Sequence, residues 1–290
     1  MFEEIALINY SNANSRDTYF TMHHVKEAHQ YGKGENIKVG IIDWCFGLRE
    51  HGDLYSGGID LSGNDFFLNS RSEHGFWMAQ ALKEIAPACE VFAINYLNGN
   101  NFNERAKYIA EAIDWAIEHE MQVLTYSGAL FSSTERQIID KAVQRAVESG
   151  IITTFIHYDY ENNFFPGALM HFHPGNREPD IRILHYDYNT LFIARYKKYA
   201  ESDISDIKSG DDIPYFSMSS MSPVLAGFVA ILKSIQSSIT LKQCKELLKE
   251  TSYTTHFVGY APWDNVDIDG VADIGKAAKL LSESVYVAEK

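Results

Sequence analysis

Four serines lie close together in the stretch YFSMSSMSPVLAGF, just ahead of a proline and an apolar run. They are Ser217, Ser219, Ser220 and Ser222. The apolar run repeats at helical spacing, which predicts a buried helix with Pro223 in its first turn, where a missing N–H costs little. A serine one turn before that proline would lie at a helix N-terminus, which favours developing negative charge. Serine also caps helices through hydrogen bonds to the backbone, so this stretch alone favours capping over catalysis.

Residues that could cooperate with such a serine lie at the ends of other predicted elements. Asp43 ends an apolar strand over about residues 37–42, Ser127 and Asp159 end two others, and His74 begins a helix. In open parallel sheets, sites form outside the carboxyl ends of the strands. A serine that attacks, a histidine that takes its proton and a carboxylate that holds the ring would form an acyl-transfer triad. Each residue alone indicates little, because aspartate often forms turns and the chain has 11 histidines.

The elements that must position these residues alternate between strand and helix, which predicts a parallel sheet covered on both faces. The predicted strands are 37–42, 89–97, 121–128 and 151–158, and the predicted helices are 74–87, 104–120 and 132–150. Ser132 and Glu135 match a capping box, and Gly150 matches a helix C-cap. Two strands, at 181–188 and 190–196, interrupt the alternation. Helices at 240–251 and 273–285 follow the helix that carries the serines.

Taken together, these segments resemble the subtilisin-like serine proteases from about residue 32 to residue 279. GENIKVGIID followed by HGDL resembles the strand to the family's catalytic aspartate, and EHGFWMAQALKEIAP resembles its His-Gly-Thr helix. IAEAIDWAIEHEMQVLTYSG resembles the helix and strand that lead to the substrate-binding edge. DKAVQRAVESGIITTF and FFPG resemble the unit before the oxyanion residue and the Tyr-Pro-Gly turn. SMSSMSP stands where the family has Gly-Thr-Ser-Met-Ala-Ser-Pro, and the order Asp, His, Ser is that of subtilisin.

The resemblance implies a three-layer α/β fold, with a central, mostly parallel, twisted sheet and helices on both faces, formed by residues 31–290. Counted back from the proline, Ser219 occupies the nucleophile position, so the implied roles are Asp43 as orienter, His74 as general base and Ser219 as nucleophile. An edge to which substrate backbone adds as a strand is also implied. This edge consists of Ser127, Gly128 and Ala129.

Several positions depart from the family pattern close to the implied site. Phe76 replaces the threonine after His-Gly, and Trp44-Cys45 replaces the Thr-Gly after the aspartate. Ser217-Met218 replaces the Gly-Thr before the nucleophile. Bulky groups at these positions could narrow the site, reduce its activity or remove it.

The family's oxyanion asparagine aligns with Asp159. An ionised carboxylate offers no donor to an oxyanion, whereas a carboxyl group that burial keeps protonated can donate like an amide. Asn162 and Asn163 in the same loop are alternative donors if the turn is longer than in relatives. The sequence therefore implies either an active peptidase or a pseudoprotease that binds a peptide or another protease.

Composition and charge limit the classes of partner. The chain has 290 residues, of which 46% are hydrophobic and 22% charged, which suits one large globular domain. A formal net charge of −14 argues against nucleic acid or an anionic membrane as a partner. We expect a peptide or protein substrate, and the sequence leaves the oligomeric state open. The start of the chain does not match a secretory signal, so a cytoplasmic setting is expected. Cys45, Cys89 and Cys244 are expected to be buried free thiols.

No metal or other cofactor is expected. His171 and His173 in HFHP lack a third ligand at suitable spacing, and GKGEN lacks the glycine pattern of a nucleotide-binding loop. Many relatives carry a calcium loop in the helix that begins at the catalytic histidine, yet QALKEIAP passes directly to the next strand. We therefore expect that micromolar calcium leaves the melting temperature almost unchanged, because a ligand that binds the folded state raises it.

Residues 1–30 precede the peptidase-like domain. EIALINY resembles the start of intracellular subtilisins, in which a short Leu-Ile-Pro-Tyr segment blocks the site, and Asn9 replaces that proline here. This resemblance implies that residues 4–10 lie near the active cleft and inhibit the enzyme. An edge strand or a disordered tail is the alternative.

Overall fold

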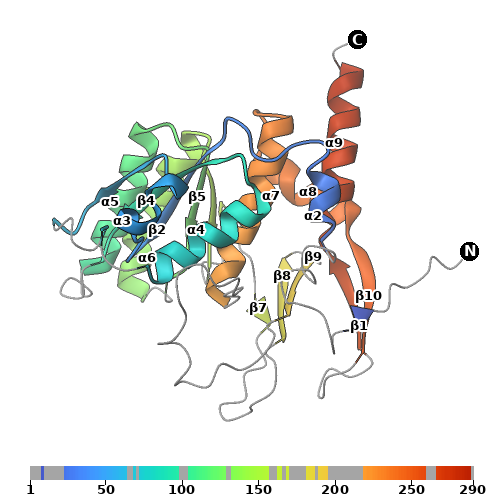
Figure 1. Ribbon diagram of the computed structural model, residues 1–290, viewed down its shortest axis with the longest axis horizontal. Coiled ribbons are helices and arrows are strands. Elements are labelled where there is room, and N and C mark those ends of the chain that lie inside the picture. Colours follow the sequence, from blue (N-terminus) through green and yellow to red (C-terminus); the bar gives the residue numbers. More distant parts are fainter. Residues whose placement is uncertain are drawn as a thin grey trace, which may run out of the picture.

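A computed structural model shows an α/β fold built around a five-stranded sheet of order β3-β4-β2-β5-β6 (Figure 1). The strands are β2 (Lys38–Asp43), β3 (Gly57–Asp60), β4 (Glu90–Asn95), β5 (Val123–Tyr126) and β6 (Ile152–Phe155). All neighbouring strands run parallel. The predicted parallel sheet is confirmed, and β3 adds an edge strand that the sequence did not indicate.

The structure describes residues 8–9, 23–63, 68–69, 72–97, 104–128, 132–156, 162–164, 168–169, 181–186, 189–194, 218–258 and 266–288. Five of the predicted site or alternative positions lie outside these ranges. They are Ala129, Asp159, His171, His173 and Ser217.

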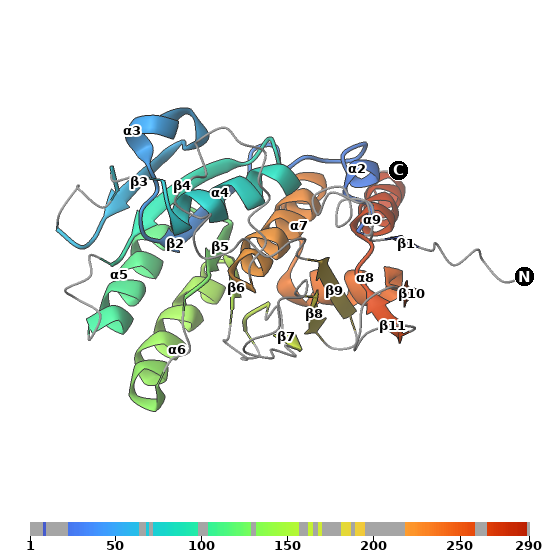
Figure 2. The same cartoon turned by 60° about the horizontal axis from the view of Figure 1, so that its bottom comes forward.

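Helices cover both faces of this sheet, as predicted. One apolar core contains buried side chains of α4 (His74–Ile85) and α7 (Met221–Ile235), and a second contains those of α5 (Arg105–Glu118) and α6 (Ser133–Glu148). Successive residues of β2 alternate between them, because Ile41 belongs to the first core and Ile42 to the second. Figure 2 shows α5 and α6 together on one side of the sheet.

A close approach of α4 and α7 depends on Gly227. A Cβ atom there would lie 2.5 Å from Cγ2 and 2.6 Å from Cβ of Ile85, closer than side-chain carbons approach one another. His74 begins α4, and the 3₁₀ turn η4 (Met218–Ser220) leads directly into α7. The packing of these two helices therefore sets the distance between the predicted base and the predicted nucleophile.

The predicted helix ends are confirmed where local hydrogen bonds define them. Ser132 and Glu135 form the reciprocal capping box of α6, and Gly150 follows that helix with a left-handed φ of 81°. Thr240 caps α8 (Leu241–Thr251) in the same way. Pro223 lies in the first turn of α7, as expected.

A second sheet has the order β1-β10-β11-β9-β8-β7 and lies to one side of the parallel sheet in Figure 1. Its strands are β1 (Ile8–Asn9), β7 (Ala168–Leu169), β8 (Ile181–Tyr186), β9 (Asn189–Ala194), β10 (Tyr253–Val258) and β11 (Val266–Val271). The two strands predicted near residues 181–196 are confirmed as β8 and β9. The β10–β11 pair was not predicted, and it precedes the final helix α9 (Ile274–Ala288).

The remaining described elements are short and belong to the N-terminal part of the chain. They are α2 (Val25–Ala28), α3 (Leu48–His51) and the 3₁₀ turn η1 (Gly52–Leu54). All three cysteines are buried free thiols, as predicted. Among the described helices, none combines the length and the apolarity that crossing a bilayer requires.

Candidate active site

Asp43 and His74 meet at the carboxyl end of the parallel sheet. Asp43 is the last residue of β2, and His74 is the first residue of α4. Nδ1 of His74 lies 2.8 Å from Oδ1 and 2.9 Å from Oδ2 of Asp43. The Asp43 side chain is 2% exposed and the His74 side chain 17% exposed, so the pair is mostly shielded from water. This arrangement fixes Nδ1 as the protonated ring nitrogen and leaves Nε2 as the possible base.

The backbone around this pair supports its geometry. The N–H of Trp44 donates to Oδ1 of Asp43 at 2.8 Å, and the N–H of Gly75 donates to the carbonyl of Trp44 at 2.8 Å. The N–H of Glu73 donates to the carbonyl of Cys45 at 3.0 Å. The residues on both sides of His74 are therefore bonded to the segment that follows Asp43.

The pKa of His74 is raised above its ordinary value of 6.5. Burial of the ring disfavours the imidazolium and lowers the pKa, but the charge of Asp43 and its hydrogen bond together outweigh that effect. An imidazolium that forms when the ring accepts a proton is therefore stabilised. A general base with this property must work at a pH above its raised pKa.

Ser219 lies in η4, and its backbone is bonded to the end of β5. Oγ of Ser127 donates to the carbonyl of Ser219 at 2.7 Å. Ser127 is buried, and its hydroxyl holds η4 in place through a contact that the sequence did not predict. Within the part of the chain that the structure describes, no hydrogen bond joins His74 to Ser219, although η4 packs against α4. In free enzymes this bond often becomes short only when substrate binds.

A second pair of bonds fixes the start of α7. Oγ of Ser222 donates to the carbonyl of Thr154 at 2.6 Å, and Oγ1 of Thr154 donates to the carbonyl of Ser222 at 3.1 Å. Both residues are fully buried. Of the four serines, Ser222 is thus committed to a structural contact with β6, while Ser219, the predicted nucleophile, lies in η4.

The predicted substrate edge begins at Ser127 and Gly128, directly after β5. A Cβ atom at residue 128 would lie 2.0 Å from the Tyr126 hydroxyl oxygen, so a side chain there would displace that ring. The Tyr126 ring is buried, and its hydroxyl lies 3.5 Å from that of Tyr96. A glycine is therefore required where the backbone passes over Tyr126.

The two asparagines proposed as alternative oxyanion donors point elsewhere. The Asn163 amide accepts from the N–H of Phe155 at 2.9 Å and donates to its carbonyl at 3.0 Å, so it binds the backbone of β6. Nδ2 of Asn162 donates to Oε1 of Gln144 on α6 at 2.9 Å. These contacts argue against either amide as the donor. Asp159 lies outside the described residues, so its role stays a prediction.

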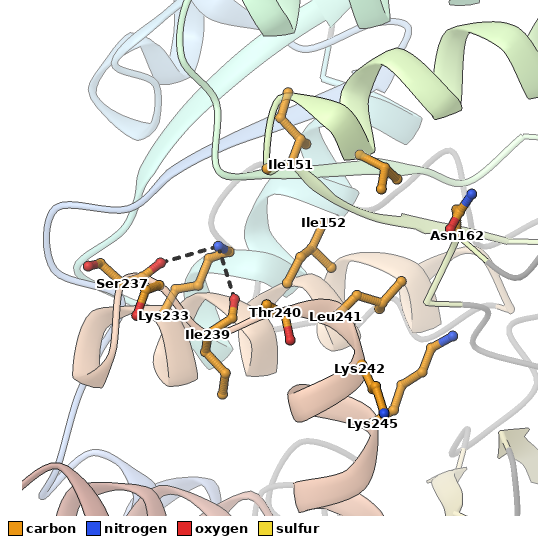
Figure 3. Close-up of a pocket in the computed structure, with 13 residues that line it drawn as sticks. Ile151, Ile152, Asn162, Lys233, Ser237, Ile239, Thr240, Leu241, Lys242 and Lys245 are labelled. Atoms are coloured by element: carbon orange, nitrogen blue, oxygen red, sulfur yellow. Dashed lines mark hydrogen bonds between the residues drawn. The ribbon is translucent and has the colours of Figure 1, made fainter. Parts of the chain in front are cut away.

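A cavity of about 560 Å³ lies away from the candidate site, between the amino end of β6, the end of α7 and the start of α8 (Figure 3). Its lining includes Ile151, Ile152, Ile239 and the buried Lys233, whose Nζ donates to the carbonyls of Ser237 and Ile239 at 3.4 Å. None of Asp43, His74 or Ser219 lines it. Among the described residues, no group of three or more acidic, histidine or cysteine side chains is placed to hold a metal ion.

Trp44 makes a second contact that the sequence did not predict. Its indole stacks on the His74 imidazole, with ring centroids 4.5 Å apart and an angle of 8° between the planes. The sequence identified Trp44 as a departure from the family pattern but gave no partner for it. Phe76, the other bulky replacement, is buried and stacks on His51.

Comparisons with solved structures support the fold. A lanthipeptide protease matches with a TM-score of 0.61 and 15% identity, over 92% of this chain and 95% of that one. MycP1, a serine protease of the type VII (ESX-1) secretion system, matches with a TM-score of 0.56 and 14% identity, over 94% and 92%. A chain of the subtilase cytotoxin SubAB matches with a TM-score of 0.59 and 14% identity, over 93% and 98%.

Neither a protein-family model nor a curated protein matches the chain. The structural likenesses confirm the predicted subtilisin-like fold across nearly the whole chain.

Proposed function

We propose that this chain is a serine endopeptidase that cleaves peptide bonds through an acyl-enzyme. The observation that supports this most directly is the buried Asp43–His74 pair, with Nδ1 of the ring held by both carboxylate oxygens. A buried pair of this kind, in a fold shared with known serine proteases, matches the base and orienter of acyl transfer.

Each step of the proposed reaction uses one of these groups. Oγ of Ser219 attacks the scissile carbonyl carbon, while Nε2 of His74 takes the hydroxyl proton. Asp43 holds the opposite N–H of the ring and stabilises the imidazolium. His74 then gives the proton to the leaving amine as the C–N bond breaks. A water that loses its proton to His74 attacks the ester, and Ser219 regains its proton when the acid product leaves.

Substrate backbone would add along Ser127, Gly128 and Ala129, the edge that follows β5. A narrow peptide substrate range is our proposal for specificity. One of the structural neighbours is named as a protease of a single peptide class, the lanthipeptides.

A second candidate is a weak or inactive protein that binds a peptide with the same edge. The aspartate at position 159 favours this alternative, because an ionised carboxylate would repel the oxyanion.

A fluorophosphonate probe separates the two candidates, because it reacts with an activated serine. We expect labelling of the wild-type chain, its loss in Ser219→Ala and His74→Ala, and its retention in Ser220→Ala. Peptide mapping should place the adduct on Ser219 among the neighbouring serines. Cleavage of a peptide library by wild type but not by Ser219→Ala would then establish the peptidase. A wild-type chain that neither reacts with the probe nor cleaves peptides supports the binding protein.

A further inference from the structure

We propose that Trp44 is a positioning residue that holds the His74 ring in its catalytic orientation by stacking on one face of it. This inference rests on the proposed function, because it concerns the base of the same reaction. Trp44 stands where the family pattern has a small threonine, so its contact with the ring is a property of this chain.

The stack is close and nearly parallel. A centroid distance of 4.5 Å and an interplanar angle of 8° fall at the short end of the range for favourable ring stacking. The indole is itself fixed, because it packs against the apolar core that contains Ile42. The Trp44 backbone donates to Asp43 and accepts from Gly75, the residue after His74. Indole, carboxylate and imidazole therefore form one connected unit.

The stack supplies a constraint that the carboxylate alone does not. Asp43 holds the ring at Nδ1, so the plane of the imidazole can still turn about that contact. A flat indole against one face restricts the plane to one orientation and so fixes the direction of Nε2. Catalysis is sensitive to such orientation, since small displacements of a catalytic group lower the rate strongly.

The same contact favours the protonated ring. The face of an indole attracts a cation, and an imidazolium at this distance gains from that attraction. Among the described residues, Asp43 on β2 is the charged group that acts on the His74 ring, and its hydrogen-bonded geometry does not depend on the indole. Glu73, on the other side of His74, has its backbone N–H bonded to Cys45. Removal of the indole should therefore change orientation and protonation together.

The test compares Trp44→Leu, which fills space without a flat aromatic face, with Trp44→Phe, which keeps one. NMR titration follows the His74 ring, which is identified by comparison with His74→Gln. In Trp44→Leu we expect His74 to titrate about half a pH unit lower. We also expect Ser219 labelling by the fluorophosphonate to be about tenfold slower at high pH, where the ring is neutral in both proteins. Trp44→Phe should restore most of both values.

The chain offers a matched control in another described Trp–His stack. The rings of Trp115 on α5 and of His119, the C-cap of α5, have centroids 3.9 Å apart and planes at 22°, away from Asp43. His119→Gln should change neither the titration of His74 nor the labelling rate. Wild-type values for either quantity in a folded Trp44→Leu protein overturn the proposal.

Wild type provides an independent measurement if Trp44→Leu does not fold. Stacking should shift the ring protons of His74 upfield through the indole ring current, and Trp44→Phe should reduce this shift. Unshifted His74 protons in wild type overturn the proposal. Failure of the proposed function has a different signature, because Ser219 would then resist labelling at every pH while the NMR measurements still report the stack.

Discussion

The His74 ring lies between an acidic group that holds its edge and an indole that covers its face. Both contacts favour the imidazolium, and the raised pKa of His74 follows from the charge and hydrogen bond of Asp43 despite the burial that opposes them. As the base of the proposed reaction, His74 becomes available only at a pH above the 6.5 of a free histidine. A second group that must stay protonated to take part in the reaction would need a low pH, whereas a neutral His74 needs a high one.

Asp159 is such a group if it donates to the oxyanion. We predict that Asp159→Asn raises turnover at neutral pH by up to about 10²-fold and shifts the pH optimum upward, because an amide donates at every pH. The pH–rate profiles of wild type and variant measure this effect. Asp159 lies outside the described residues, so its assignment rests on the family resemblance.

Asn162→Ala and Asn163→Ala serve as the matched controls. Loss of the Asn163 bonds to β6 should lower the free energy of unfolding by about 1–3 kcal/mol, with little effect on the reaction of folded protein. If an asparagine variant instead loses activity while folded, and Asp159→Asn is neutral, the oxyanion donor has been assigned to the wrong residue.

Single residues also show which parts of the candidate site could be predicted from the sequence. Asp43 and His74 were identified because a family pattern surrounds each of them. The Ser127 hydroxyl and the Trp44 ring were not assigned their partners, since Ser127 is 92 residues from Ser219 in the chain and only the fold brings them together. A side chain whose partner is distant in sequence leaves no local pattern.

At the scale of elements, the position of α4 against α7 depends on the absence of a side chain at residue 227. We predict that Gly227→Val lowers the free energy of unfolding by about 1–3 kcal/mol through overpacking against Ile85. It should also slow Ser219 labelling, because it separates the helices that position His74 and Ser219. Chemical denaturation and labelling rates measure both effects.

Gly52→Ala is the appropriate control for that substitution. Nothing lies within 4 Å of a Cβ added at residue 52, so this change should leave stability and labelling almost unaltered. A Gly227→Val protein as stable and reactive as wild type would show that α4 and α7 can separate without cost.

A second element-level prediction concerns the junction of α5 and α6. Nη2 of Arg105 donates to Oε2 of Glu135 at 3.0 Å, and Glu135 also completes the capping box of α6. The Arg105 hydrogen bonds lower the pKa of Glu135 to about 2, against the opposing effect of its partial burial. A carboxyl group with a depressed pKa stabilises the fold above its unfolded-state pKa, and this stability is lost as the pH falls through the folded value.

Between pH 4.5 and about pH 2, the melting temperature of Glu135→Gln should therefore fall less than that of wild type. Melting curves at several pH values measure this difference. Glu111→Gln removes an exposed carboxylate of α5, 3.9 Å from Lys107, and should leave the pH dependence of wild type in place. An unchanged slope in Glu135→Gln would mean that other acidic groups control acid unfolding.

Elements with local signals were predictable. The capping boxes of α6 and α8 can be identified within four residues, and the strands and helices of the parallel sheet have distinct hydrophobic periods. The β10–β11 pair was not predicted, although its two strands are neighbours in sequence and pair with each other.

At the scale of the whole molecule, the family pattern predicts a mostly parallel sheet covered by helices on both faces, and the structure confirms it. For the N-terminal segment, its prediction differs from the contacts of the two residues that the structure describes there. The resemblance to intracellular subtilisins implies that residues 4–10 lie near the cleft, whereas the two described residues of that segment, Ile8 and Asn9, pair in parallel with β10. β10 belongs to the second sheet, and Asp43, His74 and Ser219 lie on β2, α4 and η4.

We therefore predict that deletion of residues 1–10 changes the rate of Ser219 labelling by less than about twofold. The melting temperature should fall by a few degrees at most, since a two-residue strand contributes only one or two hydrogen bonds of about 1 kcal/mol each. Asn9→Pro sharpens the test, because it restores the Leu-Ile-Pro-Tyr pattern of the inhibitory segment and removes a backbone donor. If the segment is an edge strand, Asn9→Pro lowers the melting temperature and leaves the labelling rate unchanged. If the segment blocks the site, the deletion accelerates labelling and Asn9→Pro slows it, and that result would contradict the pairing with β10.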